Sequence, residues 1–165
     1  MRVADASVDS LRAELAVLAA RFVLSGLGPD VNRAITVACE LLARDLDAPG
    51  TVAVASLACG TPLRDAGPLI FDMLREQGFP APGPDAGEAD ELTTVLRAVA
   101  AGGLQTGELF TFFMRRVPAR ERQDELQRRL VVLLNDWLEE TTPEGRSAMA
   151  AAVRRAARDA VADAS

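Results

Sequence analysis

The feature that most limits how this chain can fold is a recurring spacing of apolar residues by three and four positions. Near the N-terminus, Leu11, Leu15, Leu18 and Phe22 follow this spacing. They place one apolar stripe on a helix over about residues 7–24. A second stripe predicts another helix that ends before the turn residues 47–50; its members are Val31, Ile35, Ala38, Cys39, Leu42 and Leu46.

Glycine and proline residues divide the rest of the N-terminal part. The apolar stretch 51–59 fits either a strand or a short buried helix, and its alanines and helical surroundings favour the helix. The next helix has Pro62 and Pro68 as candidate first-turn prolines, and it is expected to end at Gly78.

A segment rich in proline and glycine follows this helix and marks a change in composition. Residues 79–91 also carry four acidic side chains and no basic one. Such a composition is typical of a linker. We therefore expect an N-terminal helical half over residues 1–78, an acidic linker over 79–91 and a C-terminal helical half over 92–165, with a single overall domain as the open alternative.

Four more helices are expected after the linker. The first ends at Gly102 and Gly103, the second carries the phenylalanines, and the third starts from Pro118 in its first turn. The last follows the sequence TTPEG, where either Thr141 or Thr142 fits as the N-cap. The fold class is thus all-α, an irregular bundle of seven to eight helices in two packed halves.

Composition excludes much of enzyme chemistry. All 18 basic residues are arginine, and the chain has no histidine, lysine or tyrosine. Histidine acid–base or metal chemistry and lysine-based Schiff bases are therefore not available to it. We expect no catalytic residues and no cofactor, so the protein is not expected to be an enzyme.

Charge, cysteine usage and hydropathy bear on partners and location. A net charge of −6 argues against nucleic acid as a partner. Cys39 and Cys59 form no CxxC pair and are expected to be small buried residues. No apolar run approaches the roughly 20 residues that span a bilayer, and the N-terminus lacks a signal-peptide segment. We therefore expect a cytoplasmic protein that does not contact a membrane.

The stretch GELFTFFMRRVPARER, residues 107–122, is the main candidate for a binding site. On a helix its aromatic residues occupy two faces, which fits a core helix covered from two directions. The other interpretation is a partner or ligand surface, because aromatic residues and arginine are enriched at interface centres. The contact candidates are Phe110, Phe112, Phe113, Arg115, Arg116 and Trp137.

A second, weaker candidate is a cluster of carboxylates in the sequence NDWLEE. Asp136, Glu139 and Glu140 have the i, i+3, i+4 spacing that can bring oxygen ligands to a divalent cation. An acidic surface turn at a helix end explains the same residues, and this is the favoured interpretation.

Two regions of the sequence are similar to a known group of proteins. LLARDLDAPGTVAVASLACG with REQGF, and RAVAAGGLQTGELFTFF with NDWLEETTPEGRSAMAAAVRRAARD, resemble parts of small all-helical proteins from high-GC bacteria. That group has no assigned activity. The resemblance implies a helical layout and a bacterial cytoplasm, and it assigns no functional residues.

The preferred function is a non-catalytic protein–protein interaction module of the immunity, inhibitor or adaptor type. Its partner is expected to be another protein, and a homodimer is an open alternative. A helical bundle that binds an apolar small molecule through Phe110, Phe112, Phe113 and Trp137 is the second hypothesis. A metal-dependent enzyme that uses only carboxylates is the third.

Overall fold

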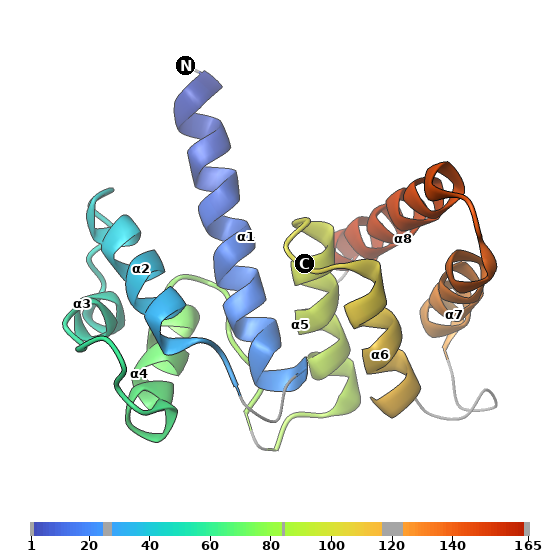
Figure 1. Ribbon diagram of the computed structural model, residues 1–165. Helices are drawn as coiled ribbons and strands as arrows, with labels where there is room; N and C mark the ends of the chain where they lie inside the picture. Colours follow the sequence, from blue (N-terminus) through green and yellow to red (C-terminus); the bar gives the residue numbers. More distant parts are fainter. Residues whose placement is uncertain (1, 25–27, 84, 117–123, 164–165) are drawn as a thin grey trace.

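The computed structural model describes residues 2–24, 28–83, 85–116 and 124–163. These residues form eight helices and no strand, so the predicted all-α bundle is confirmed. The elements are shown in Figure 1; their bounds are α1 Arg2–Leu24, α2 Val31–Leu42, α3 Pro49–Ala55, α4 Leu63–Glu76, α5 Glu88–Ala100, α6 Thr106–Arg116, α7 Glu125–Glu139 and α8 Pro143–Asp163.

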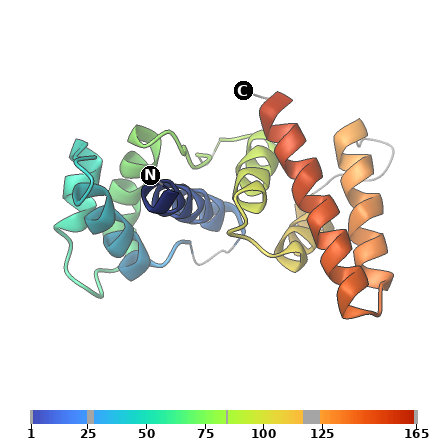
Figure 2. The ribbon, with the colours of Figure 1, turned by 90° about the horizontal axis from the view of Figure 1, so that it is seen from above.

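Helix α1 lies between two groups of helices and packs against both. One hydrophobic cluster, here the first cluster, joins α1 to α2, α3 and α4 and includes Leu11, Leu15 and Leu18 of α1. The other, the second cluster, joins α1 to α5, α6, α7 and α8 and includes Ala16 and Ala20. Figures 1 and 2 show α1 in this central position.

The connection between α4 and α5 is also part of the packing. Ala81 is buried in the first cluster, and Phe79 packs against both clusters. The predicted linker residues 88–91 belong to the first turn of α5 rather than to the connection. The division of the protein into two halves by a linker over residues 79–91 stays a prediction.

Two predicted helix ends are confirmed because a glycine adopts the left-handed conformation there. Gly78 has φ of 80° and Gly102 has φ of 79°. After α5, Gly103 N donates to Ala98 O at 3.0 Å and Gly102 N donates to Val99 O at 3.0 Å. This pair of bonds is a Schellman motif, which satisfies the last carbonyls of the helix.

Helix α2 ends four residues earlier than the apolar spacing predicts. Its last residue is Leu42, and Asp45 takes a left-handed conformation with φ of 59°. Leu46, predicted on the buried stripe, is therefore outside the helix and 45% exposed. An aspartate in this conformation is uncommon and gives no clear stop signal.

Two prolines also differ from their predicted roles. Pro62 is the N-cap of α4, and Pro68 lies inside that helix rather than in its first turn. Pro118 lies outside the described residues. The described helix α7 begins after Asp124, which caps it in an extended conformation and accepts a bond from Gln127 N at 2.7 Å.

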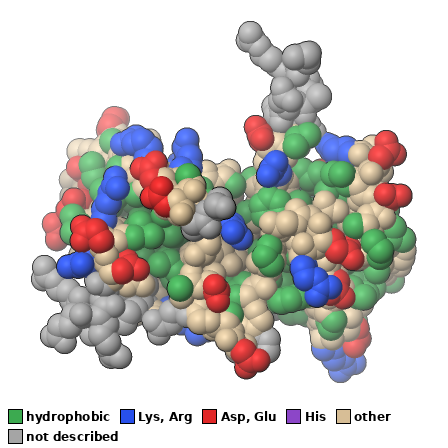
Figure 3. Space-filling view, turned by 180° about the vertical axis from the view of Figure 1, so that it is seen from behind, with side chains coloured by type: hydrophobic (Ala, Val, Ile, Leu, Met, Phe, Trp, Pro, Cys, Tyr) green, Lys and Arg blue, Asp and Glu red, His purple; other side chains and the backbone are tan. Residues whose placement is uncertain are grey.

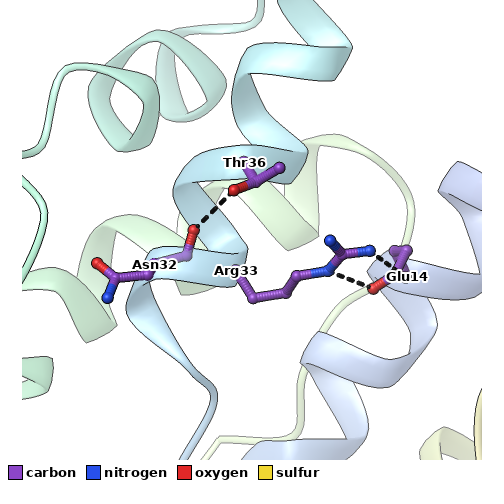
Figure 4. A network of polar contacts seen from close by, with 4 residues as sticks. All are labelled: Glu14, Asn32, Arg33 and Thr36. Carbon is purple, nitrogen blue, oxygen red and sulfur yellow. Dashed lines mark hydrogen bonds and ion pairs between the residues drawn. The ribbon is translucent and has the colours of Figure 1, made fainter.

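A polar network joins α1 to α2, as Figure 4 shows. Arg33 of α2 donates to Glu14 of α1 through Nη2, and its Nε donates to Glu14 Oε2 at 3.0 Å. The hydrogen bond with Glu14 raises the pKa of Arg33 above its ordinary value. The preceding residue, Asn32, accepts a bond from Gly60 N through Oδ1 at 3.0 Å, which ties the loop after α3 to α2.

None of the described helices combines the length and the apolar character that crossing a bilayer requires. On the face in Figure 3, basic and acidic side chains are interspersed among hydrophobic ones.

Candidate functional site

The aromatic and arginine-rich stretch forms helix α6, and Glu108 fixes where that helix begins. Glu108 Oε2 accepts a bond from Gln105 N at 3.1 Å, which satisfies one free donor before the first turn. Glu108 Oε1 lies 2.8 Å from Arg21 Nη2 of α1. One carboxylate therefore caps α6 and also holds it beside the end of α1.

The inner side of α6 is part of the protein core. Leu109, Phe112 and Phe113 are buried, and the two phenylalanine rings meet edge to face at 6.0 Å between centroids. Phe110 is half-buried and packs on the same cluster. The inner side of α6 therefore fits the interpretation of a core helix, and residues 117–122 of the same stretch lie outside the described residues.

The outer side of α6 faces a groove that it forms with the end of α1. We call this cavity of about 590 Å³ the α1–α6 groove; it is lined by Arg21, Val23, Leu24, Gln105, Gly107, Glu108, Thr111, Phe112, Arg115 and Arg116. Helix α5 packs against both α1 and α6 and so holds the two walls in place (Figure 1).

The groove combines apolar and charged surface. The half-buried Leu24 contributes apolar surface, and the buried Val23 and Phe112 reach the groove only with their edges. Thr111 and Arg115 on α6 are exposed. Three arginines and one glutamate line it, so its described lining carries an excess of two positive charges. This excess stands out in a chain with net charge −6.

The three arginines are compensated to different degrees. Arg21 forms the close ion pair with Glu108. Arg116 Nη1 lies 3.7 Å from Glu91 Oε2, which is too long for a hydrogen bond, and this carboxylate oxygen is buried without a hydrogen-bond partner among the described residues. Arg115 has no ion-pair partner in the part of the chain that the structure describes. Among the described residues, the arginine of the groove without an ion-pair partner thus lies at the C-terminal end of α6.

The structure brings together three of the six predicted contact residues. Phe112, Arg115 and Arg116 line the groove, whereas Phe110 and Phe113 do not. Trp137 of α7 is also outside the groove. A Cβ atom on Gly107 would lie 3.5 Å from its Cη2 atom, and the guanidinium of Arg146 stacks on the indole at 5.6 Å.

The carboxylates at the end of α7 were the weaker candidate site, with an acidic surface turn as the favoured interpretation. Asp136 and Glu139 are exposed, and no group of carboxylates in the described chain is placed to hold a metal ion. Glu140 instead accepts bonds from the backbone N and the Oγ1 of Thr142, both at 2.8 Å. The backbone hydrogen bond from Thr142 is the main reason that the pKa of Glu140 is below its ordinary value.

The prediction that the cysteines are buried is wrong. Cys39 and Cys59 are both exposed free thiols. Cys39 lies beside the buried stripe of α2, which consists of Ala34, Val37, Ala38 and Leu41. Cys59 follows the end of α3, since that helix stops at Ala55 and leaves it in an exposed turn.

Sequence reasoning missed the α1 side of the groove. Arg21 and Leu24 occupy the last turn of α1, and nothing in their local spacing indicates that α6 lies opposite. The α6 side could be predicted from the sequence, because Glu108, Thr111 and Arg115 recur at the spacing of one helix face. Only the packing of α1 on α5 turns that face into a wall of a groove.

Comparison with known protein families, with curated proteins and with solved structures finds no match to this chain.

Proposed function

We propose that this protein is a non-catalytic protein–protein interaction module of the immunity, inhibitor or adaptor type. In this proposal its partner docks in the α1–α6 groove. The observation that carries the proposal is the half-buried Leu24, with the exposed edges of Val23 and Phe112, beside Arg115, which is exposed and has no ion-pair partner among the described residues. Interface centres are enriched in this combination of aromatic residues and arginine.

The surroundings of the groove support a macromolecular partner. Met114 on α6 is 72% exposed, so apolar surface continues beyond the cavity itself. Exposed methionine is flexible and is common at binding surfaces. Among the described lining residues the ionisable groups are three arginines and Glu108, whose carboxylate is paired with Arg21.

The location is part of the same proposal. The resemblance of two regions to small helical proteins of high-GC bacteria favours a bacterial cytoplasm. An adaptor or immunity protein would meet its partner there.

Binding of an apolar small molecule is a second candidate function, favoured by the groove volume. A cavity of about 590 Å³ falls within the range of about 300–1,000 Å³ that is typical of ligand pockets. The residues involved would then be Phe112, Val23 and Leu24 rather than Phe113 or Trp137. A thermal-shift screen of apolar compounds tests this candidate, and a groove-dependent rise in the melting temperature would favour it over a protein partner.

Site-specific photocrosslinking tests the main proposal. A benzoylphenylalanine replaces the exposed Thr111 inside the groove, and the matched control carries it at Val132, which is exposed on α7 outside the groove. In cells of the native host, we expect a covalent adduct with one other protein from position 111 and none from position 132.

Equal labelling from both positions, or no protein adduct from position 111, would contradict docking in this groove. An adduct of twice the chain's own mass would show that a second copy is the partner and would replace the adaptor model with self-association.

A further inference from the structure

The α1–α6 groove has a direction, which limits what it can bind. On this side its lining residues run from Gln105, just before α6, to Arg116, the last residue of the helix. Helix α6 has 11 residues and is therefore about 16 Å long. An amphipathic helix of about three turns matches this length, and such helices commonly lie in apolar grooves.

Charge is distributed unevenly along that length. Near the start of α6, Glu108 neutralises Arg21 at 2.8 Å. At the other end, Arg115 has no ion-pair partner among the described residues, and Arg116 reaches only the distant Glu91 at 3.7 Å. A ligand that fits the groove therefore carries negative charge beside Arg115 and Arg116, and it needs no charge at the end where Arg21 and Glu108 pair.

We propose that the groove's occupant is an acidic amphipathic segment of a partner protein. Its apolar side chains would contact Leu24 and the exposed edges of Val23 and Phe112, and its carboxylates would pair with Arg115 and Arg116. The guanidinium group favours carboxylates because its planar donors can bind both oxygens. This inference rests on the proposed function and adds the chemistry of the partner.

The net charge of the chain distinguishes a short acidic segment from a long polyanion. Charges are screened over about 8 Å at physiological salt, so a short segment interacts mainly with the local arginines. A nucleic acid extends further and meets the surface of a chain with net charge −6. The groove therefore favours a peptide over a nucleic acid.

Fluorescence anisotropy with synthetic peptides tests the inference. The probe is a labelled 12-residue helical peptide with leucines along one face and glutamates at one end. A second peptide has glutamine in place of each glutamate, and a third has lysine. We expect the glutamate peptide to bind roughly tenfold more tightly than the glutamine peptide, and the lysine peptide to bind least.

Variants of the protein locate the binding. Arg115→Gln is expected to lower the affinity for the glutamate peptide roughly twofold to fivefold. The Arg115→Gln/Arg116→Gln double variant is expected to lower it roughly tenfold. Arg154→Gln is the matched control, since Arg154 is an exposed arginine of α8 that does not line the groove. Thr111→Trp fills the groove from an exposed position and is expected to abolish binding, with circular dichroism to verify folding.

Three results would overturn the inference. They are equal binding of the glutamate and glutamine peptides, no binding of the glutamate peptide, and stronger competition by inorganic phosphate or a DNA oligonucleotide than by unlabelled peptide. In each case the crosslinking from position 111 decides separately whether a protein docks in the groove. Failure of the acidic-segment inference is thereby distinguishable from failure of the proposed function.

Discussion

Gly50 lies where α3 packs against α4, and no larger residue fits there. A Cβ atom at this position would lie 2.7 Å from Met73 N and 2.9 Å from Met73 Cα, both in the backbone of α4. Gly50 N also donates to Glu76 Oε2 at 2.7 Å. The missing side chain therefore permits both the close helix contact and the bond that caps α3.

We predict that Gly50→Ala lowers the free energy of unfolding by roughly 2–3 kcal/mol, because the backbone of α4 has to move away. Urea denaturation followed by circular dichroism measures the change. Gly83→Ala is the control, since a Cβ atom there meets nothing within 4 Å. Equal stability of the two variants would show that α3 and α4 can separate at little cost.

Because its pKa is lowered in the folded chain, Glu140 is expected to make the α7–α8 corner less stable at low pH. Hydrogen bonds from Thr142 hold the pKa of Glu140 below its ordinary value. Because the folded pKa is the lower one, the charged carboxylate contributes stability that is fully present above the unfolded pKa. That contribution is lost as the pH falls through the folded pKa.

We therefore predict that Glu140→Gln is less stable than the native chain at pH 7, and that the difference shrinks below about pH 4. Urea denaturation of both proteins across this range measures it. Glu139→Gln removes a neighbouring exposed charge and serves as the control at pH 7. A difference that grows as the pH falls would contradict the role of Thr142 as a donor to the charged carboxylate.

At the scale of the helix, α8 is capped by one of two adjacent threonines that the sequence leaves equivalent. Thr142 Oγ1 accepts a bond from Gly145 N at 3.1 Å, and Arg146 N donates to Thr142 O at 3.0 Å. Thr142 is thus the N-cap, and Pro143 takes the first helical position, where a proline is favourable.

We predict that Thr142→Ala costs about 1 kcal/mol of stability, as for other N-caps, whereas Thr141→Ala stays within about 0.5 kcal/mol. Thermal and urea unfolding of the two single variants gives the comparison. A larger effect of Thr141→Ala would assign the cap to the other threonine.

Local chemistry explains which helix ends could be predicted. Gly78 and Gly102 were predictable because glycine adopts the left-handed conformation of a C-terminal cap without strain. Asp45 takes a similar conformation without being a glycine. The apolar spacing therefore predicted that α2 extends to Leu46, which lies outside the helix. Pro68 resembles a first-turn proline in sequence, and its place inside α4 follows only from the earlier start at Leu63.

The candidate site was predictable on one side only. The face of α6 that carries Thr111 and Arg115 follows from helical spacing. The other wall comes from Arg21 and Leu24 of α1, which are far away in the sequence. Their position depends on how α1 and α5 pack, and packing between distant segments leaves no local signal.

At the scale of the whole molecule, α1 couples the two hydrophobic clusters. Leu15 and Leu18 belong to the first cluster, and Ala16 and Ala20 of the same helix belong to the second. Loss of either cluster removes the support of one face of α1. We therefore expect the two clusters to unfold together.

Leu41→Ala tests this coupling. Leu41 is buried in the first cluster, and Trp137, the chain's one tryptophan, lies on α7 at the other end of the molecule (Figure 1). The substitution is expected to cost roughly 2–5 kcal/mol and to lower the urea midpoint of tryptophan fluorescence as much as that of circular dichroism. A fluorescence midpoint that stays unchanged would show two independently folding halves.

The packing of α1 against both clusters also affects how such a protein can change during evolution. An exchange of gene segments at the proline-rich connection would give the new chain either α1 without α5 or α5 without α1. Each product would expose apolar surface that the other half normally covers. Recombination at this boundary is therefore disfavoured, and we expect the two halves to be inherited as one unit.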